Sequence, residues 1–139
     1  FFRIGINKKV VKEFFLADYS SENVMQSMKE MGSAWGAHRE VIYKAESALC
    51  ELMEGMIQSE KTTEKIKLEA VFNEVSLELY IRYTGELPEF PDRRPSRFHM
   101  EDESEYDRGL SGFLIRKYVD KLNYKQNQKD CEIHLHFEH

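Results

Sequence analysis

The sequence predicts an α/β (α+β) fold, a two-layer sandwich in which a mixed, mainly antiparallel sheet is covered on one face by three helices. One observation is a single apolar stripe from Arg39 to Gln58 with the period of an α-helix, which is typical of a helix with one buried face. The other is the alternation of apolar and polar residues over 65–72 and over 76–83, separated by Asn73-Glu74. This alternation predicts two half-buried strands joined as an antiparallel hairpin. Helices and strands of these kinds pack as separate layers around one core.

The composition is that of one globular domain of ordinary size. The chain has 139 residues, of which 41% are hydrophobic and 32% are charged, which excludes the disordered and fibrous classes. Its formal net charge of −5 argues against nucleic acid as a partner. No apolar run approaches the roughly 18 residues that predict a membrane-spanning helix. Cys50 and Cys131 are expected to be reduced, buried thiols in a cytosolic compartment.

The beginning of the chain indicates where the domain starts. Because the first residue is Phe1 and not a methionine, we expect a fragment or a processed product of a larger protein. Residues 1–7 are interpreted as a linker or juxtamembrane segment, and residues 8–139 as a single domain. Loose alternation of apolar residues predicts the first strand within Lys8–Leu16.

A helix is expected to follow this strand. Ser20 or Ser21 has the side chain of a helix N-cap, and apolar residues recur at helical spacing up to about residue 31. Gly32 and Gly36 then punctuate the pattern, so the helix is predicted to end near them.

The stretch from Gly85 to Asp107 is predicted to be a long loop. It contains all three prolines, a basic group at Arg93, Arg94 and Arg97, and an acidic run from Glu101 to Asp107. A loop of this length indicates either a function or disorder. The basic group could meet an anionic lipid or a partner, or the acidic run could neutralise it locally.

The remainder of the chain is predicted to form a helix and a closing strand or hairpin. Gly109 is expected to open the helix, whose apolar face reaches Leu122. The final strand alternates between polar residues and four that are expected to face the core, namely Cys131, Ile133, Leu135 and Phe137.

Three short stretches are candidates for chemistry. The central helix places Glu51 and Gly55 one turn apart at the same edge of its apolar stripe. A strand ends in Tyr83-Thr84-Gly85, and the last helix begins with Gly109-Leu110-Ser111-Gly112. Together with the order of elements, these stretches resemble the GHKL family, which includes anti-sigma-factor kinases and the ATPase domains of sensor histidine kinases.

The resemblance implies a nucleotide site that has lost most of its working groups. Glu51 matches the general base of the family, but Gly55 stands where an asparagine holds Mg²⁺. Tyr83 replaces the aspartate that binds adenine, although Gly85 is kept. In the phosphate-binding turn Gly109 matches and Ser111 replaces the second glycine, just before Gly112.

These replacements predict that ATP and Mg²⁺ are not cofactors and that the chain is not an enzyme. Glu51 is then a vestigial general-base position, or simply a solvated helix residue. The glycines are equally compatible with an ordinary turn after a strand and with a helix that is needed for packing alone.

Two histidines form a weaker candidate. His134 and His136 lie on one face of the last strand, with Glu132, Glu138 and His139 near them in sequence. Such a face could bind Zn²⁺. A solvated polar sheet face is the preferred interpretation, so no metal is predicted.

A second resemblance concerns origin. Four stretches are similar to the cytosolic C-terminal extension of some bacterial xanthine/uracil permeases. They are Phe2–Ile6, Ile81–Gly85 with Arg93–Ser96, Gly112–Arg116 and Leu135–His139. That resemblance implies a non-catalytic regulatory or interaction domain on the cytoplasmic side of the inner membrane. Its partner would be the parent transporter or a second copy of the domain, with the Gly85–Asp107 loop in the contact surface. The alternatives are a small ATP-binding kinase of the anti-sigma type and a free-standing dimerisation module.

Overall fold

The structure is a computed structural model that describes residues 8–59, 65–96 and 103–138, without the side chains of Ser21, Gln58, Ser59 and Ser104. The proposed linker, residues 1–7, lies outside the described residues. The elements, in chain order, are β1 (Lys8–Phe15), η1 (Leu16–Asp18), α1 (Ser21–Trp35), α2 (Arg39–Ser59), β2 (Lys65–Phe72), β3 (Ser76–Thr84), α3 (Glu103–Tyr118), β4 (Lys121–Asn127) and β5 (Asp130–Glu138).

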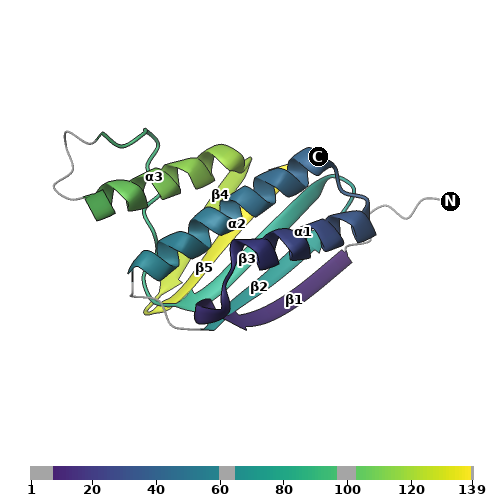
Figure 1. Ribbon diagram of the computed structural model, residues 1–139, viewed down its shortest axis with the longest axis horizontal. Coiled ribbons are helices and arrows are strands. Elements are labelled where there is room, and N and C mark those ends of the chain that lie inside the picture. The colour runs from purple at the N-terminus through teal and green to yellow at the C-terminus, as the bar shows by residue number, and fades with distance from the viewer. Residues whose placement is uncertain (1–7, 60–64, 97–102, 139) are drawn as a thin grey trace.

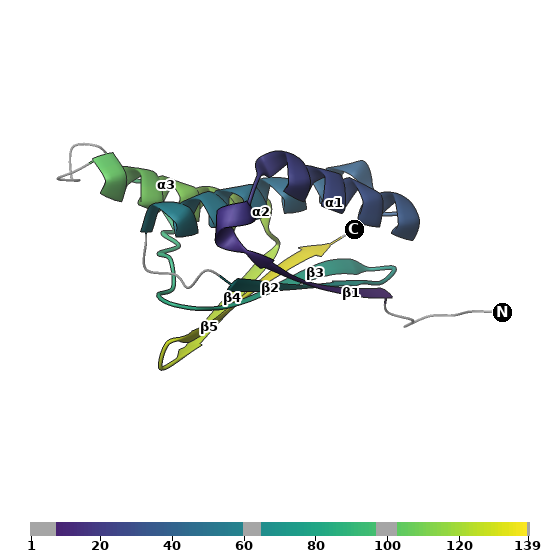
Figure 2. The ribbon, with the colours of Figure 1, turned by 60° about the horizontal axis from the view of Figure 1, so that its bottom comes forward.

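These elements form two layers, a five-stranded sheet and three helices that cover one face of it (Figure 2). The strand order is β1-β2-β3-β5-β4, and all four pairings are antiparallel. The sheet is therefore antiparallel throughout, and the prediction of a mixed sheet is wrong. The reason lies in the connections. Two helices separate β1 from β2 and return the chain in the opposite direction. The single helix α3 makes β4 run parallel to β3, but β5 is inserted between them, so no parallel pair forms.

Helix α2 is the centre of the helical layer, with α1 on one side and α3 on the other (Figure 1). Its predicted apolar stripe is confirmed, because every member is buried: Val41, Ala45, Ala48, Leu49, Leu52, Met53 and Met56. The inward residues of β3 and β5 are also buried as predicted, among them Leu79, Ile81, Ile133 and Leu135 at zero exposure. The periodicities of 3.6 and 2 residues therefore identify the two faces that make the core.

Helix α1 begins as predicted and ends later than predicted. The Ser20 hydroxyl accepts a hydrogen bond from the amide of Asn23, and Gly36 closes the helix in the left-handed conformation at φ 71°. Gly32 does not end the helix, because it lies inside it against α2. A Cβ atom at Gly32 would lie 2.6 Å from Cγ1 of Ile42, so this glycine allows close packing of the two helices.

Helix α3 begins at Glu103, well before the predicted start at Gly109. Its first turn contains Glu103 and Glu105, whose negative charges are favourable at a helix N-terminus. The acidic run is therefore partly helical, and the loop after β3 is shorter than predicted. Leu122 belongs to β4 and not to the helix, so the chain ends in a hairpin.

Two further observations concern the chain as a whole. Among the helices of the described residues, none combines the length and the apolar character that crossing a bilayer requires. Both cysteines are free thiols. Cys131 is buried as expected, whereas Cys50 is only partly buried.

Candidate functional site

Four of the predicted site residues meet in one pocket. It has a volume of about 320 Å³ and lies between α2, the segment 86–89 and α3. Glu51 and Gly55 line it from α2, and Ser111 and Gly112 line it from α3. The remaining predicted residues, Tyr83, Gly85 and Gly109, are not part of this lining.

The wall of the pocket is rich in carboxylates. Glu51, Glu86, Glu89 and Glu105 all contribute to it, against the single guanidinium of Arg108 among the described lining residues. The negative charges of these carboxylates repel an anion in the pocket, and this repulsion is stronger than in bulk water because the surrounding protein has a lower effective dielectric constant. The lining therefore disfavours a polyphosphate and is better suited to a cationic group.

The α2 side of the pocket has free space at Gly55, the position where the GHKL resemblance would place a metal-binding asparagine. A Cβ atom built on Gly55 would meet no heavy atom within 4 Å. The absence of a side chain is therefore not the result of crowding. Mg²⁺ requires oxygen ligands, and a glycine provides no side-chain oxygen at this position.

The α3 side does not contain the expected phosphate-binding turn. Gly109, Ser111 and Gly112 lie in the interior of α3, more than one turn after its start. Amide groups at such positions donate to carbonyls one turn earlier in the helix and are not available to a ligand. The prediction of a glycine turn that opens a helix here is wrong.

Gly112 has a packing role instead of a role in phosphate binding. A Cβ atom at this position would lie 1.8 Å from the carbonyl oxygen of Glu89 and 3.3 Å from Cα of Phe90. The backbone of the segment after β3 thus rests directly on α3. Only a residue without a side chain permits this approach.

Tyr83 and Gly85 fasten the same segment where it leaves β3. Tyr83 is buried, and its hydroxyl donates a hydrogen bond of 2.9 Å to the carbonyl of Glu86. Burial raises the pKa of the Tyr83 phenol, and the neighbouring Cys131 adds to this effect. Gly85 has φ 151°, and its amide donates to the carbonyl of Lys129 at 2.8 Å. Both residues therefore hold the chain in place.

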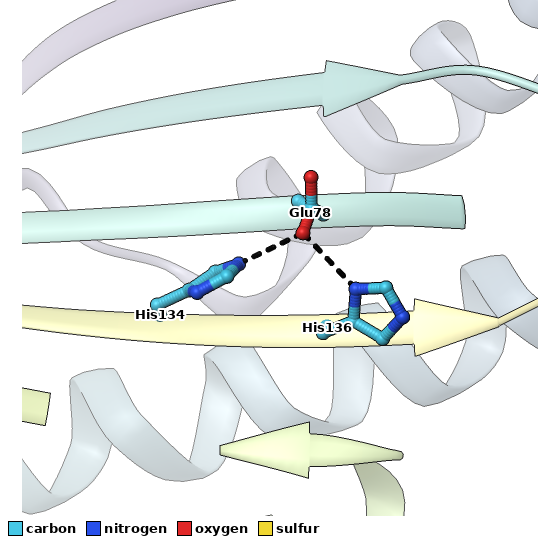
Figure 3. Close-up of side chains that lie close together, drawn as sticks. All are labelled: Glu78, His134 and His136. Carbon is cyan, nitrogen blue, oxygen red and sulfur yellow. Dashed lines mark hydrogen bonds and ion pairs between the residues drawn. The ribbon is translucent and has the colours of Figure 1, made fainter. Parts of the chain in front are cut away.

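A second cluster lies on the opposite, helix-free face of the sheet. Nε2 of His134 and Nδ1 of His136 lie 3.1 Å and 3.0 Å from the same oxygen, Oε1 of Glu78. Figure 3 shows that both imidazoles point from β5 toward Glu78 on the neighbouring strand β3. Within the described part of the chain, this is the group whose positions suit a metal ion, with all three ligand atoms within 4.8 Å of one another.

The surroundings of Glu78 favour its ionised form. Burial raises the pKa of this carboxyl, but the hydrogen bond from His136 and the charge of His134 outweigh burial and lower the pKa overall. The ring of Tyr80 stacks on His134 with centroids 4.3 Å apart and limits its rotation.

Sequence reasoning identified the two histidines but missed Glu78. The register of β3 and β5 pairs Glu78 with His136, and such a pairing between distant segments cannot be read from one strand alone. Of the acids that were considered, Glu138 lies 3.6 Å from Nε2 of His136, whereas Glu132 pairs with a different group. His139 lies outside the described residues.

Charged side chains cover the middle of the same face. Glu69 lies 2.7 Å from Nζ of Lys9 and 3.2 Å from Nη1 of Arg82. Glu132 lies 3.5 Å from Nε of Arg82 and 3.6 Å from Nζ of Lys125. This row of alternating charges crosses all five strands, so the outer face there is polar and largely self-paired.

Comparison with known proteins adds no family assignment. No protein-family model matches the sequence, and no curated protein matches it. The resemblances described above therefore rest on the residues of this chain alone.

Proposed function

We propose that this chain is a non-catalytic regulatory or interaction domain that is related to the GHKL ATPases but has lost nucleotide hydrolysis. The observation that carries the proposal is the pocket between α2 and α3. It gathers four of the seven positions that a GHKL site would use, yet its wall is acidic and its α3 amides belong to a helix interior.

Each requirement of an ATPase is weakened at a separate position. Gly55 offers no oxygen to Mg²⁺, and Tyr83 uses its hydroxyl to bind the carbonyl of Glu86. Metal-assisted phosphoryl transfer depends on positioning and on charge neutralisation by the metal and by phosphate-binding donors. The combined losses favour a binding module over an enzyme.

A small kinase of the anti-sigma type is the second candidate. Glu51 is half-buried and lines the same pocket as Ser111 and Gly112, which is the arrangement that favours this alternative. A working enzyme would bind Mg-ATP there and would lose turnover on Glu51→Gln.

The segment after β3 is the proposed contact surface. Phe90 is buried, its carbonyl accepts a hydrogen bond of 3.0 Å from Nε of Arg116, and its ring lies 5.1 Å from that of Tyr124. The segment is thus anchored up to Phe90, and the exposed Arg93 and Arg94 follow directly. A fixed backbone reduces the entropy that the segment loses on binding, and arginine is favoured at interfaces. Arg97 lies outside the described residues.

We further propose that the parent protein is a transporter of the xanthine/uracil permease type, with this domain on the cytoplasmic side of the inner membrane. The support is the similarity of the four short stretches described above. Its partner is then the transporter or a second copy of the domain, whereas a free-standing dimerisation module would need only the latter. A reading frame that encodes no membrane spans beside this domain would exclude the transporter origin.

The contact surface can be tested in the full-length protein. Replacing Arg93 and Arg94 with serine should change uptake by the parent transporter, or the mass of the isolated domain in light scattering. A variant with Lys29 and Arg39 replaced by serine changes the charge equally on exposed helical positions and should leave both unchanged. If the two variants behave alike, the segment is not the working surface.

A further inference from the structure

The cluster of Glu78, His134 and His136 contains the donor types that transition metals prefer. Imidazole nitrogen and carboxylate oxygen are standard ligands of Zn²⁺, and two histidines with one carboxylate leave a fourth position open. Mg²⁺ and Ca²⁺ prefer sites made of oxygen atoms alone, so the two imidazoles select against them.

The distances are close to those of a metal site. In a tetrahedral site with bonds of about 2.0–2.1 Å, neighbouring ligand atoms lie about 3.3 Å apart. Here Oε1 of Glu78 lies 3.1 Å from Nε2 of His134 and 3.0 Å from Nδ1 of His136. All three ligand atoms lie within 4.8 Å of one another, so rotation of the side chains is what placing them around an ion requires.

The backbone beneath the cluster is held firmly. Strands β3 and β5 are inner strands of the sheet, each paired on both sides, and their register places Glu78 directly opposite His136. The side chains of His136, His134 and Glu78 are 16%, 21% and 25% exposed. A partly buried site of this kind strengthens the attraction between a cation and a carboxylate.

Groups around the cluster orient the two imidazoles. Oε1 of Glu138 lies 3.6 Å from Nε2 of His136, the nitrogen that does not face Glu78. A carboxylate on the second nitrogen of a metal-binding histidine fixes its ring and raises its basicity. Tyr80 stacks on His134. The positive charge of Lys121 would repel a bound cation, because the register places Lys121 across from His136. Lys121 is exposed, however, and its long side chain can extend into water.

We propose that Glu78, His134 and His136 bind one divalent transition-metal ion of the Zn²⁺ type, through Oε1, Nε2 and Nδ1 respectively. The ion joins β3 to β5 on the helix-free face and keeps one coordination position open to water or to a donor from a partner. The site is separate from the pocket between α2 and α3, so it does not depend on whether that pocket binds a nucleotide.

The test uses the untagged, full-length chain with ZnCl₂ as the probe. Calorimetry should show one ion per chain at micromolar or tighter affinity, and saturation should raise the thermal unfolding temperature. The double variant His134→Ala, His136→Ala should lose this binding, and Glu78→Gln should weaken it at least tenfold. Unfolding measured without metal shows whether each variant is folded.

A matched control separates this site from other histidines. The sequence has five histidines, and the variant His38→Ala, His99→Ala, His139→Ala removes the other three. This control should bind Zn²⁺ as the wild type does. The proposal is overturned if the wild type shows no saturable binding, if the double variant binds equally well, or if the control loses the ion.

Discussion

Gly112→Ala tests the contact between the segment after β3 and helix α3. The added Cβ would lie 1.8 Å from the carbonyl oxygen of Glu89, whereas ordinary contact begins at 3.4 Å. The obstacle is backbone, so it cannot rotate away as a side chain could. Overpacking of this kind costs about 3 kcal/mol at the upper end of its usual range. The higher helix propensity of alanine offsets about 1 kcal/mol of this destabilisation.

The net expectation is a loss of about 2 kcal/mol of unfolding free energy. Urea unfolding should show it as a midpoint lower by about 1 M, for a slope of about 2 kcal/mol per M. The single tryptophan, Trp35, stacks on Phe72 at 5.5 Å and reports the transition by fluorescence.

Gly55→Ala is the matched control in a neighbouring helix. No heavy atom lies within 4 Å of the new Cβ, so this variant should be more stable than wild type by up to about 1 kcal/mol. If Gly112→Ala is as stable as Gly55→Ala, the segment does not rest on α3, and the packing role of Gly112 is refuted.

Two further substitutions test individual interactions. Tyr83→Phe removes the hydroxyl that holds the segment after β3 and should cost about 1 kcal/mol in urea unfolding; no change would mean that the hydrogen bond does not stabilise the fold. For Glu69, the hydrogen bond from Lys9 lowers the carboxyl pKa below its usual 4.5 against the opposing effect of burial, and Arg82 lowers it further. This carboxylate therefore contributes stability above its unfolded pKa, and the contribution is lost as the pH falls through its folded pKa. Glu69→Gln should destabilise by about 0.5–1 kcal/mol at pH 7 and make no difference near pH 2, and an equal loss at both pH values would contradict the ionic role.

The parts of the fold that the sequence predicted well have strong local periodicity. The stripe of α2, the hairpin of β2 and β3, and the alternation of β5 each bury one face, so the pattern alone identifies them. Strand β4 was not assigned separately because it is an edge strand with mostly exposed residues, so burial imposes little alternation on it.

The glycines misled the prediction for a physical reason. Gly32 was interpreted as the end of a helix and the stretch from Gly109 to Gly112 as the turn that opens another, since glycine lowers helix propensity by about 1 kcal/mol. In the structure Gly32 and Gly112 lie inside helices and permit close approaches, to Ile42 and to Glu89 respectively. Tertiary packing outweighs a propensity of this size, and one sequence cannot reveal the partner.

The candidate site was predictable only in part. Glu51, Gly55, Ser111 and Gly112 line one pocket, whereas Tyr83, Gly85 and Gly109 do not. Its acidic character depends on Glu86 and Glu105, which come from segments whose placement no local pattern predicts. Glu78 was missed for the same reason, because strand pairing places it beside the histidines.

Calorimetry with Mg-ATP and Mg-ADP is the most direct test of the proposed loss of nucleotide chemistry. We expect no saturable binding by the wild type up to millimolar nucleotide. Gly55→Asn, which introduces the asparagine that the GHKL resemblance would place there, should also fail to bind, because the α3 amides remain within the helix and the pocket remains acidic. Micromolar affinity of the wild type, or ATP turnover that disappears on Glu51→Gln, would show instead that the pocket is a working nucleotide site.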